Sequence, residues 1–281
     1  MSNKVVLITG ASSGIGLTTA KMLLKDGYTV YCAARRTELM DSLKEEGGHP
    51  LFLDLCDNES IKACVDSVLQ AEGHVDILIN NAGYATGGAL EDTTIEEAKR
   101  QFEVNVFGLI RITQLCLPSM REQKSGTIIN ISSMGGLFSS PFLGWYHAAK
   151  YSVEALSDSL RNEVKAFGIN VVIIEPGLIK TNWGVIAANI IEKNSGTTAY
   201  RENALLYSDF YKRNYNEHAN VSDPSVISKA IYKAIKAKRP KTRYRLGKNS
   251  HSFVFLKRIL PDRVFDFTSD NLIKFYGVKK N

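Results

Sequence analysis

Short apolar runs rich in β-branched residues alternate with longer amphipathic stretches through the first 180 residues. The runs that predict strands are residues 4–9, 29–34, 50–53, 76–80, 127–131 and 170–174. The stretches that predict helices are residues 17–25, 61–71, 95–114 and beyond, and 146–167. Strands that alternate with helices indicate parallel βαβ units, and strands that are apolar throughout indicate a sheet covered on both faces. We therefore predict an α/β fold with a doubly wound parallel sheet, in which ligands bind at the carboxyl ends of the strands.

The pattern changes after residue 177. Residues 182–217 are polar and aromatic with a weak helical period, and residues 224–236 predict a helix with a proline in its first turn. The last 45 residues lack clear alternation. They belong to a basic region, because residues 229–281 contain fifteen Lys and Arg against three Asp, in a chain whose net charge is +6.

Composition narrows the class of protein. Hydrophobic residues make up 44% of the 281 residues and charged residues 23%, which is typical of a soluble globular protein with a large core. No apolar run approaches the roughly 18 residues that span a bilayer, and the first run is too short for a signal peptide. None of the four cysteines forms a CxxC pair or has zinc-ligand spacing. We expect a cytoplasmic protein without a metal site.

A glycine-rich loop directly follows the first predicted strand and opens a helix. Residues 9–16 read TGASSGIG. Gly10 permits a tight turn, Gly14 lets the backbone approach a pyrophosphate, and Gly16 allows close packing of helix and strand. The helix N-terminus adds N–H groups and a favourable dipole for an anion. A tight turn without a ligand is the alternative for this loop alone.

Four motifs occur in order. The glycine loop is followed by Asn80-Asn81-Ala82-Gly83, by Ser133 with Tyr146-x-x-x-Lys150, and by residues 176–181, PGLIKT. Together they cover residues 4–181, and in this the chain resembles the classical short-chain dehydrogenases/reductases. The resemblance implies a Rossmann-like single domain (residues 1–281) that transfers a hydride between a nicotinamide cofactor and a carbonyl or alcohol. Residues 1–181 would form the cofactor-binding and catalytic core, 182–217 a substrate lid, and 218–281 a helix with a basic extension.

Tyr146 and Lys150 suit acid–base chemistry. A phenol with a pKa of about 10 is a poor base near neutral pH, but an ammonium four residues along a helix favours the phenolate. By resemblance, Tyr146 is the acid/base, and Lys150 lowers its pKa and contacts the ribose. The resemblance also assigns Ser133 to the substrate carbonyl and Asn105 to a helix kink and a water for proton relay. Alone, each residue has an ordinary structural explanation.

The residues at the end of the second predicted strand indicate which nicotinamide cofactor the protein binds. An acidic residue there would bind the ribose of NAD, but the chain has Arg35 and Arg36, whose guanidinium groups suit the 2′-phosphate of NADP. We predict NADP(H), with NAD(H) and two solvated arginines as the alternatives, since Ser13 lacks the basic side chain that some NADP-preferring relatives carry. The full set of expected cofactor-binding residues is Gly10, Ser12, Ser13, Gly14, Ile15, Gly16, Arg35, Arg36, Asp54, Asn81, Ala82, Gly83, Tyr146, Lys150, Pro176, Gly177, Ile179 and Thr181.

Apolar residues gather after residue 177 and around Ser133 and Tyr146. They predict a hydrophobic substrate, lipid-like, steroid-like or aromatic, that Ser133, Tyr146, Phe142 and Trp183 contact. The basic C-terminal region is similar to that of the branch with 17β-hydroxysteroid and retinol dehydrogenases and acyl-dihydroxyacetone-phosphate reductases, and it allows weak peripheral membrane contact. By resemblance, a homodimer or homotetramer forms through the helices carrying Asn105 and Tyr146.

Two other classes of function were weighed. A catalytically silent dinucleotide sensor would lack Ser133, Tyr146 or Lys150, and all three are present. A nucleic-acid binder needs aromatic platforms among its charges, and the aromatic residues of the tail are sparse. We expect an enzyme with no nucleic-acid partner.

Overall fold

Seven parallel strands form one twisted sheet in the computed structural model, which describes residues 4–215 and 221–277. The spatial order is β3-β2-β1-β4-β5-β6-β7, and each neighbouring pair is parallel. The strands are β1 (Val5–Thr9), β2 (Thr29–Ala34), β3 (His49–Phe52), β4 (Ile77–Asn80), β5 (Gly126–Ile131), β6 (Ile169–Pro176) and β7 (Arg243–Leu246). This confirms the predicted α/β class, and β7 is an addition that the sequence pattern did not predict.

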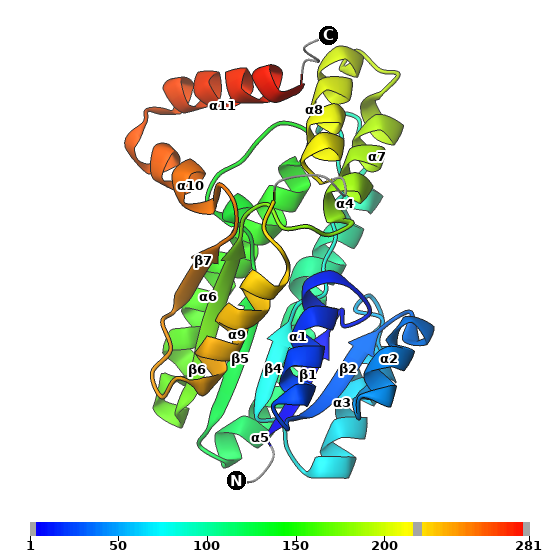
Figure 1. Ribbon diagram of the computed structural model, residues 1–281, viewed down its shortest axis with the longest axis vertical. Coiled ribbons are helices and arrows are strands. Elements are labelled where there is room, and N and C mark those ends of the chain that lie inside the picture. Colours follow the sequence, from blue (N-terminus) through cyan, green and yellow to red (C-terminus); the bar gives the residue numbers. More distant parts are fainter. Residues whose placement is uncertain (1–3, 216–220, 278–281) are drawn as a thin grey trace.

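Helices cover both faces of the sheet (Figure 1). One face carries α1 (Gly14–Lys25) and α9 (Ser225–Lys236), and the other carries α3 (Asn58–Glu72), α5 (Leu109–Glu122) and α6 (Gly144–Val164). Because side chains alternate along a strand, Val6 and Ile8 of β1 join the first layer while Val5 and Leu7 join the second. The remaining short helices are α2 (Asp41–Glu45) and the 3-10 turns Thr37–Met40, Met134–Gly136 and Lys165–Phe167.

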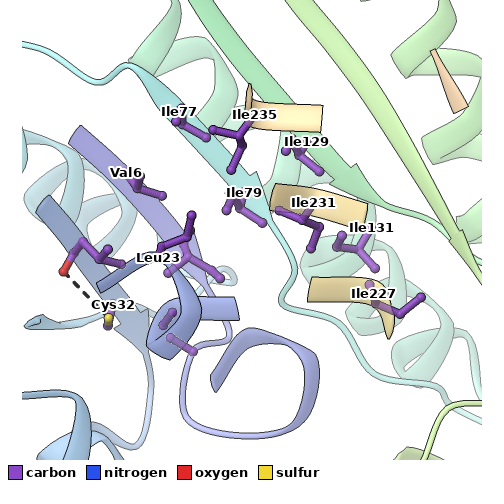
Figure 2. Packing of buried hydrophobic residues seen from close by; sticks show 14 of the residues in the cluster. Val6, Leu23, Cys32, Ile77, Ile79, Ile129, Ile131, Ile227, Ile231 and Ile235 are labelled. Atoms are coloured by element: carbon purple, nitrogen blue, oxygen red, sulfur yellow. Dashed lines mark hydrogen bonds between the residues drawn. The ribbon is translucent and has the colours of Figure 1, made fainter. Parts of the chain in front are cut away.

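Isoleucines dominate the layer under α9. Ile227, Ile231 and Ile235 recur at every fourth position, so they share the face of α9 that lies on β4 and β5 (Figure 2). All three are buried, and burying such a side chain contributes roughly 1.5 to 3 kcal/mol. The helix predicted at residues 224–236 therefore closes one face of the core.

The long helix predicted from residue 95 is interrupted. Its first part is α4 (Ile95–Phe102), whose N-terminus is stabilised by a capping box formed by Thr94 and Glu97. A π-helical segment, Glu103–Gly108, separates α4 from α5. Such π-helical segments are frequent at functional sites. Gly108 lies in it, where a Cβ would come within 2.6 Å of the Leu55 carbonyl oxygen.

Four helices lie beyond the carboxyl ends of the strands: α7 (Trp183–Ser195), α8 (Arg201–Asn214), α10 (Ser250–Ile259) and α11 (Asp262–Gly277). In Figure 1, α7 and α8 form a hairpin above the sheet, and α11 reaches across to α8. The predicted lid, residues 182–217, thus consists of two helices, and its last two residues fall outside the described residues. The C-terminal region without clear alternation contains β7, α10 and α11.

Candidate active site

A cavity of about 710 Å³ opens at the carboxyl ends of the strands. Its walls come from the loops after β1, β2, β3, β4, β5 and β6, and from the helices beyond them. In doubly wound folds, ligands bind in this position, beside the point where the strand order reverses. Here that point is the β1–β4 pair.

The glycine loop forms one wall of the cavity. Gly10 and Gly14 have positive φ angles of 68° and 54°, which favour glycine. Gly14 faces the cavity beside Thr181, whose Cγ2 would lie 3.1 Å from a Cβ on Gly14. Gly16 lies behind the loop, because a Cβ there would come within 2.2 Å of the Gly10 carbonyl oxygen. The loop therefore brings backbone and the N-terminus of α1 to the cavity.

Asn81 and Thr9 hold this loop in place. The Asn81 Nδ2 donates to the carbonyl oxygens of Thr9, at 2.9 Å, and Gly10, at 3.2 Å. The Thr9 Oγ1 accepts from the N–H groups of Asn81 and Ala82, each at 3.0 Å. The Asn80–Gly83 motif is thus tied to the glycine loop, and its backbone reaches the same cavity.

Cationic side chains line the cavity beyond the glycine loop. Arg35 and Arg36 follow β2, are exposed, and line the cavity together with Asp54. Arg100 of α4 also lines the cavity, which the sequence pattern did not indicate. The Asp54 carboxylate accepts a 3.0 Å hydrogen bond from the Cys56 N–H, which fixes its side chain at the end of β3.

Tyr146 and Ser133 meet next to the end of β5. The Tyr146 phenol is hydrogen-bonded to Ser133, and the Gly135 N–H donates to the Ser133 Oγ at 3.0 Å. Burial raises the pKa of Tyr146 to about 12, and the hydrogen bond with Ser133 opposes that shift. The phenol is therefore protonated at neutral pH, as an acid for a developing alkoxide must be.

Lys150 lies one helical turn from Tyr146 on α6. Its Nζ donates to the Ile131 carbonyl oxygen at 2.8 Å and lies 5.9 Å from the centre of the Tyr146 ring. Burial lowers the pKa of Lys150 to about 8, and the charge of Glu154 opposes that shift. Burial therefore dominates the pKa values of both Tyr146 and Lys150, whereas the sequence argument expected the lysine charge to dominate that of the phenol.

Asn105 lies behind the cavity wall in the π-helical segment. Its Nδ2 donates to the Tyr84 carbonyl oxygen at 2.8 Å, and its Oδ1 accepts from the Tyr84 N–H at 3.2 Å. A Cβ on Gly83 would lie 3.3 Å from the Asn105 Oδ1 and 3.7 Å from the Lys150 Nζ. The structure thus brings Asn105 and Lys150 to the same glycine.

Aromatic rings enclose the other end of the cavity. The Trp183 ring lies 4.9 Å from the Tyr146 ring and 6.1 Å from the Tyr211 ring. Phe142, expected at the substrate, is not among the lining residues. Its φ angle of 66° turns the backbone, and its ring packs at 5.1 Å on Tyr207. We expected Phe142 at the substrate because it is close to Tyr146 in the sequence. In the structure, its side chain instead belongs to the buried cluster that contains Tyr207.

Other residues at this end carried no sequence signal. The cavity is also lined by His147, Ser140, Tyr215, Phe253, Ser269 and Ile273. The last three come from α10 and α11, so the C-terminal helices complete the chamber. The remaining expected cofactor-binding residues line the cavity as well: Ser12, Ser13, Ile15, Ala82, Gly83, Pro176, Gly177, Ile179 and Thr181.

The sequence of this chain matches a known family. The model of the short chain dehydrogenases matches residues 4–188, and the chain belongs to that family. It is therefore a short-chain dehydrogenase/reductase, an NAD(P)-dependent oxidoreductase that acts on a carbonyl or alcohol. Within the described residues, no group of His, Cys, Asp and Glu side chains could hold a metal ion, and no helix has the length and apolar character to cross a membrane.

Individual relatives cover nearly the whole chain. A probable short-chain type dehydrogenase/reductase of Helicobacter pylori is 38% identical over 93% of this chain and 95% of its own. The 3-ketodihydrosphingosine reductase of Bacteroides thetaiotaomicron is 34% identical over 99% and 100%. Among solved structures, a short-chain dehydrogenase from Streptomyces avermitilis superposes with a TM-score of 0.79 at 34% identity, covering 99% of both chains.

Proposed function

We propose that this enzyme uses NADP(H) to interconvert a hydrophobic, lipid-like ketone and its secondary alcohol, with Tyr146 as the acid/base. The observation that carries the proposal is one continuous cavity. It has the Tyr146 phenol and Ser133 hydroxyl under an aromatic cover at one end and two exposed arginines at the other.

The cavity walls fit a dinucleotide. Gly14 leaves space that a side chain would fill, and the N-terminus of α1 presents N–H groups to a pyrophosphate there. A bound nicotinamide dinucleotide supplies the hydride. Lys150 lines the same end of the cavity as Tyr146 and would bind the nicotinamide ribose, and Ile179 and Thr181 would bind the carboxamide.

The protein's own side chains handle the proton. Ser133 and Tyr146 both present an O–H to a carbonyl oxygen, which favours the transition state as negative charge develops on that oxygen. Tyr146 then gives its proton to the alkoxide. Asn105 holds the Tyr84 backbone near Lys150, and by resemblance to the family it would position a water that returns a proton to the phenol.

Arg35 and Arg36 support the preference for NADP(H). They follow β2, where an acidic residue would bind the ribose of NAD and repel the 2′-phosphate of NADP. A guanidinium instead pairs with a phosphate through two hydrogen bonds. A relative from Ornithobacterium rhinotracheale, 32% identical over 94% of this chain, bears the name NADPH-dependent 3-dehydrocapnine reductase. An NAD(H) preference is the alternative.

The lining residues support a lipid-like substrate. Trp183, Ile186, Phe210 and Ile273 give the chamber an apolar cover. Two relatives bear the names 3-ketodihydrosphingosine reductase and NADPH-dependent 3-dehydrocapnine reductase, which supports a substrate of this kind. An apolar chamber of this kind also supports the proposal that the enzyme belongs to the branch with hydroxysteroid and retinol dehydrogenases.

The experiment compares NADPH with NADH in the reduction of 3-ketodihydrosphingosine and shorter ketones. Arg35→Glu should lower the NADPH-to-NADH ratio of kcat/KM by about 10- to 100-fold, since a charge-assisted hydrogen bond contributes roughly 1.5 to 3 kcal/mol. Lys165→Glu makes the same charge change in the turn that precedes β6, outside the cavity lining, and should leave the ratio unchanged. A wild-type preference for NADH would refute the cofactor assignment.

The C-terminal helices present a surface that fits peripheral membrane contact. Phe255 and Ile259 of α10 and Val264 and Phe267 of α11 are exposed apolar residues, and basic side chains lie among them. We expect weak, salt-sensitive binding to phosphatidylserine vesicles that Phe267→Ser reduces. Equal vesicle binding by the wild-type protein and Phe267→Ser would contradict a membrane contact through this surface.

A further inference from the structure

A three-residue turn, Met134–Gly136, holds the Ser133 hydroxyl at the wall of the cavity. The Gly135 N–H donates to the Ser133 Oγ at 3.0 Å, and the Gly136 N–H donates to the Ser133 carbonyl oxygen, also at 3.0 Å. Because the Oγ already accepts from Gly135, the single proton of the hydroxyl is left for a group outside the turn. Tyr146 lies on that side, and its phenol is hydrogen-bonded to Ser133.

The imidazole of His147 holds the other side of the same glycine. His147 follows Tyr146 on α6, and its Nδ1 lies 2.8 Å from the Gly135 carbonyl oxygen. A carbonyl oxygen only accepts, so the Nδ1 carries a proton and donates it to this hydrogen bond. Among the described residues, no other group donates to the Gly135 carbonyl oxygen. His147 therefore ties the turn to α6.

Close packing leaves Gly135 little room to move. A Cβ on Gly135 would lie 2.8 Å from the His147 Nδ1 and 3.4 Å from the Ser133 Oγ, so the glycine is confined between the imidazole and the hydroxyl. The imidazole is itself buried, with its Nε2 3.0 Å from the Ser140 Oγ and its ring centre 6.0 Å from that of Phe138. A displacement of the His147 ring would thus reach the Ser133 hydroxyl through Gly135.

We infer that His147 is a positioning residue for carbonyl reduction, which holds Gly135 and thereby keeps the Ser133 hydroxyl directed at the substrate carbonyl. The inference rests on the proposed function, in which Ser133 donates to that carbonyl oxygen. Preorganised donors stabilise the transition state most, because negative charge develops on the oxygen there. Loss of the His147 hydrogen bond should therefore lower kcat and leave cofactor binding unchanged.

Three variants separate the hydrogen bond of His147 from its bulk. His147→Leu removes the donor, and we expect kcat for ketone reduction with NADPH to fall by about three- to tenfold, the size of one neutral hydrogen bond. In His147→Asn the amide nitrogen takes the place of Nδ1, since both are bonded to Cγ, so this variant should keep the wild-type kcat. His147→Gln carries the same amide one bond further out and should lose as much activity as His147→Leu. If His147→Leu does not fold, the contrast between the two amides makes the same test.

A double-mutant cycle tests whether His147 acts through Ser133. Ser133→Ala removes the hydroxyl that Gly135 holds, so His147→Leu should have little further effect on kcat in that background, whereas independent sites would give additive losses. The matched control is His74→Leu, because the His74 Nδ1 also lies 2.8 Å from a backbone carbonyl oxygen, that of Glu72, and lies outside the cavity lining. His74→Leu should keep the wild-type kcat. The dissociation constant of NADPH, measured by its fluorescence, should be the same in His147→Leu and the wild-type protein.

Hydrogen exchange provides a readout that does not depend on turnover. The Gly135 amide should exchange about tenfold faster in His147→Leu and His147→Gln than in the wild-type protein and His147→Asn, because the turn opens more often without its hydrogen bond to α6. Absence of turnover with every ketone and both cofactors would refute the proposed function, and this exchange would still test the role of His147. A wild-type kcat in His147→Leu, equal losses with and without the Ser133 hydroxyl, or equal exchange in all four proteins would overturn the inference.

Discussion

Tyr146, Ser133 and Lys150 each depend on a backbone group for their position. The Gly135 N–H holds the Ser133 Oγ, and the Ile131 carbonyl oxygen holds the Lys150 Nζ. Both backbone groups lie at or just beyond the end of β5, which carries the polar groups to the cavity. Any displacement of this strand end would therefore change the distance between the phenol and the ammonium.

The pKa values of these groups predict a pH profile for carbonyl reduction. Lys150 is protonated below its pKa of about 8 and loses its charge as pH rises through that value, while Tyr146, with a pKa of about 12, keeps its proton. We expect kcat/KM for reduction to be level below pH 8 and to fall above it. In Lys150→Arg the guanidinium stays charged, so the fall should move to higher pH, and steady-state rates between pH 6 and 10 measure it. An identical alkaline fall in that variant would show that another group titrates.

At the scale of elements, β7 connects the C-terminal region to the helix that carries Tyr146. Arg243 of β7 donates to Glu154 of α6 at 3.1 Å and to Asp158 at 2.6 Å. It also pairs with the fully buried Glu175 of β6 at 3.2 Å, which Arg245 contacts at 2.7 Å. The edge strand thus supplies the cations that two buried carboxylates require.

Removing Arg243 should destabilise the fold. Arg243→Leu leaves Glu154 and Glu175 short of a counter-charge, and breaking a buried pair costs roughly 3 to 5 kcal/mol. Because the Arg243 side chain is 31% exposed, we expect a cost that is somewhat smaller than this, about 2 to 4 kcal/mol, in urea unfolding at neutral pH. Lys62→Leu removes an exposed i,i+4 pair and should leave the unfolding midpoint nearly unchanged. Equal midpoints for the two variants would refute this account of β7.

The same arginines explain why the pattern of residues predicts six strands but not the seventh. Strands β1, β2, β4, β5 and β6 are almost wholly buried and read as apolar runs. In β7 the sequence is RYRL, because its inward positions pair with acids of other elements. That partnership is tertiary, so hydrophobic periodicity does not reveal it. The π-helical break at Asn105 is likewise invisible to a 3.6-residue period.

The spacing of the motifs predicts the polar residues of the site, whereas the hydrophobic pattern of the chain does not predict which side chains enclose the cavity. Ser133, Tyr146 and Lys150 are recognisable because their chemistry requires fixed spacing, and the structure brings them together. His147, Tyr211 and the α11 residues Ser269 and Ile273 come from separate segments and enter the chamber only through tertiary packing. Tyr211 falls within the predicted lid, but nothing along the chain marks His147, Ser269 or Ile273.

At the scale of the whole molecule, two exposed apolar positions indicate an interface. Phe107, 48% exposed, lies in the π-helical segment, and Leu156, 39% exposed, lies on α6. We propose that the helices carrying Asn105 and Tyr146 pair between two copies of the chain. Phe107→Asp would bury a charge in that interface and should shift sedimentation velocity from a dimer to the monomer, or from a tetramer to a dimer. Ile186→Asp, at a similarly exposed position on α7, should not. A monomeric wild-type protein would contradict the proposal.

The central claim is that Tyr146 transfers the proton in an NADP(H)-dependent reaction, and a kinetic comparison of two tyrosines on α6 tests it most directly. Tyr146→Phe removes the buried phenol, and Tyr151→Phe removes an exposed one a little more than a turn further on. We predict that NADPH-dependent ketone reduction falls by about 10²- to 10⁴-fold in Tyr146→Phe, while NADPH still binds, and is unchanged in Tyr151→Phe. Near wild-type turnover by Tyr146→Phe would contradict the account.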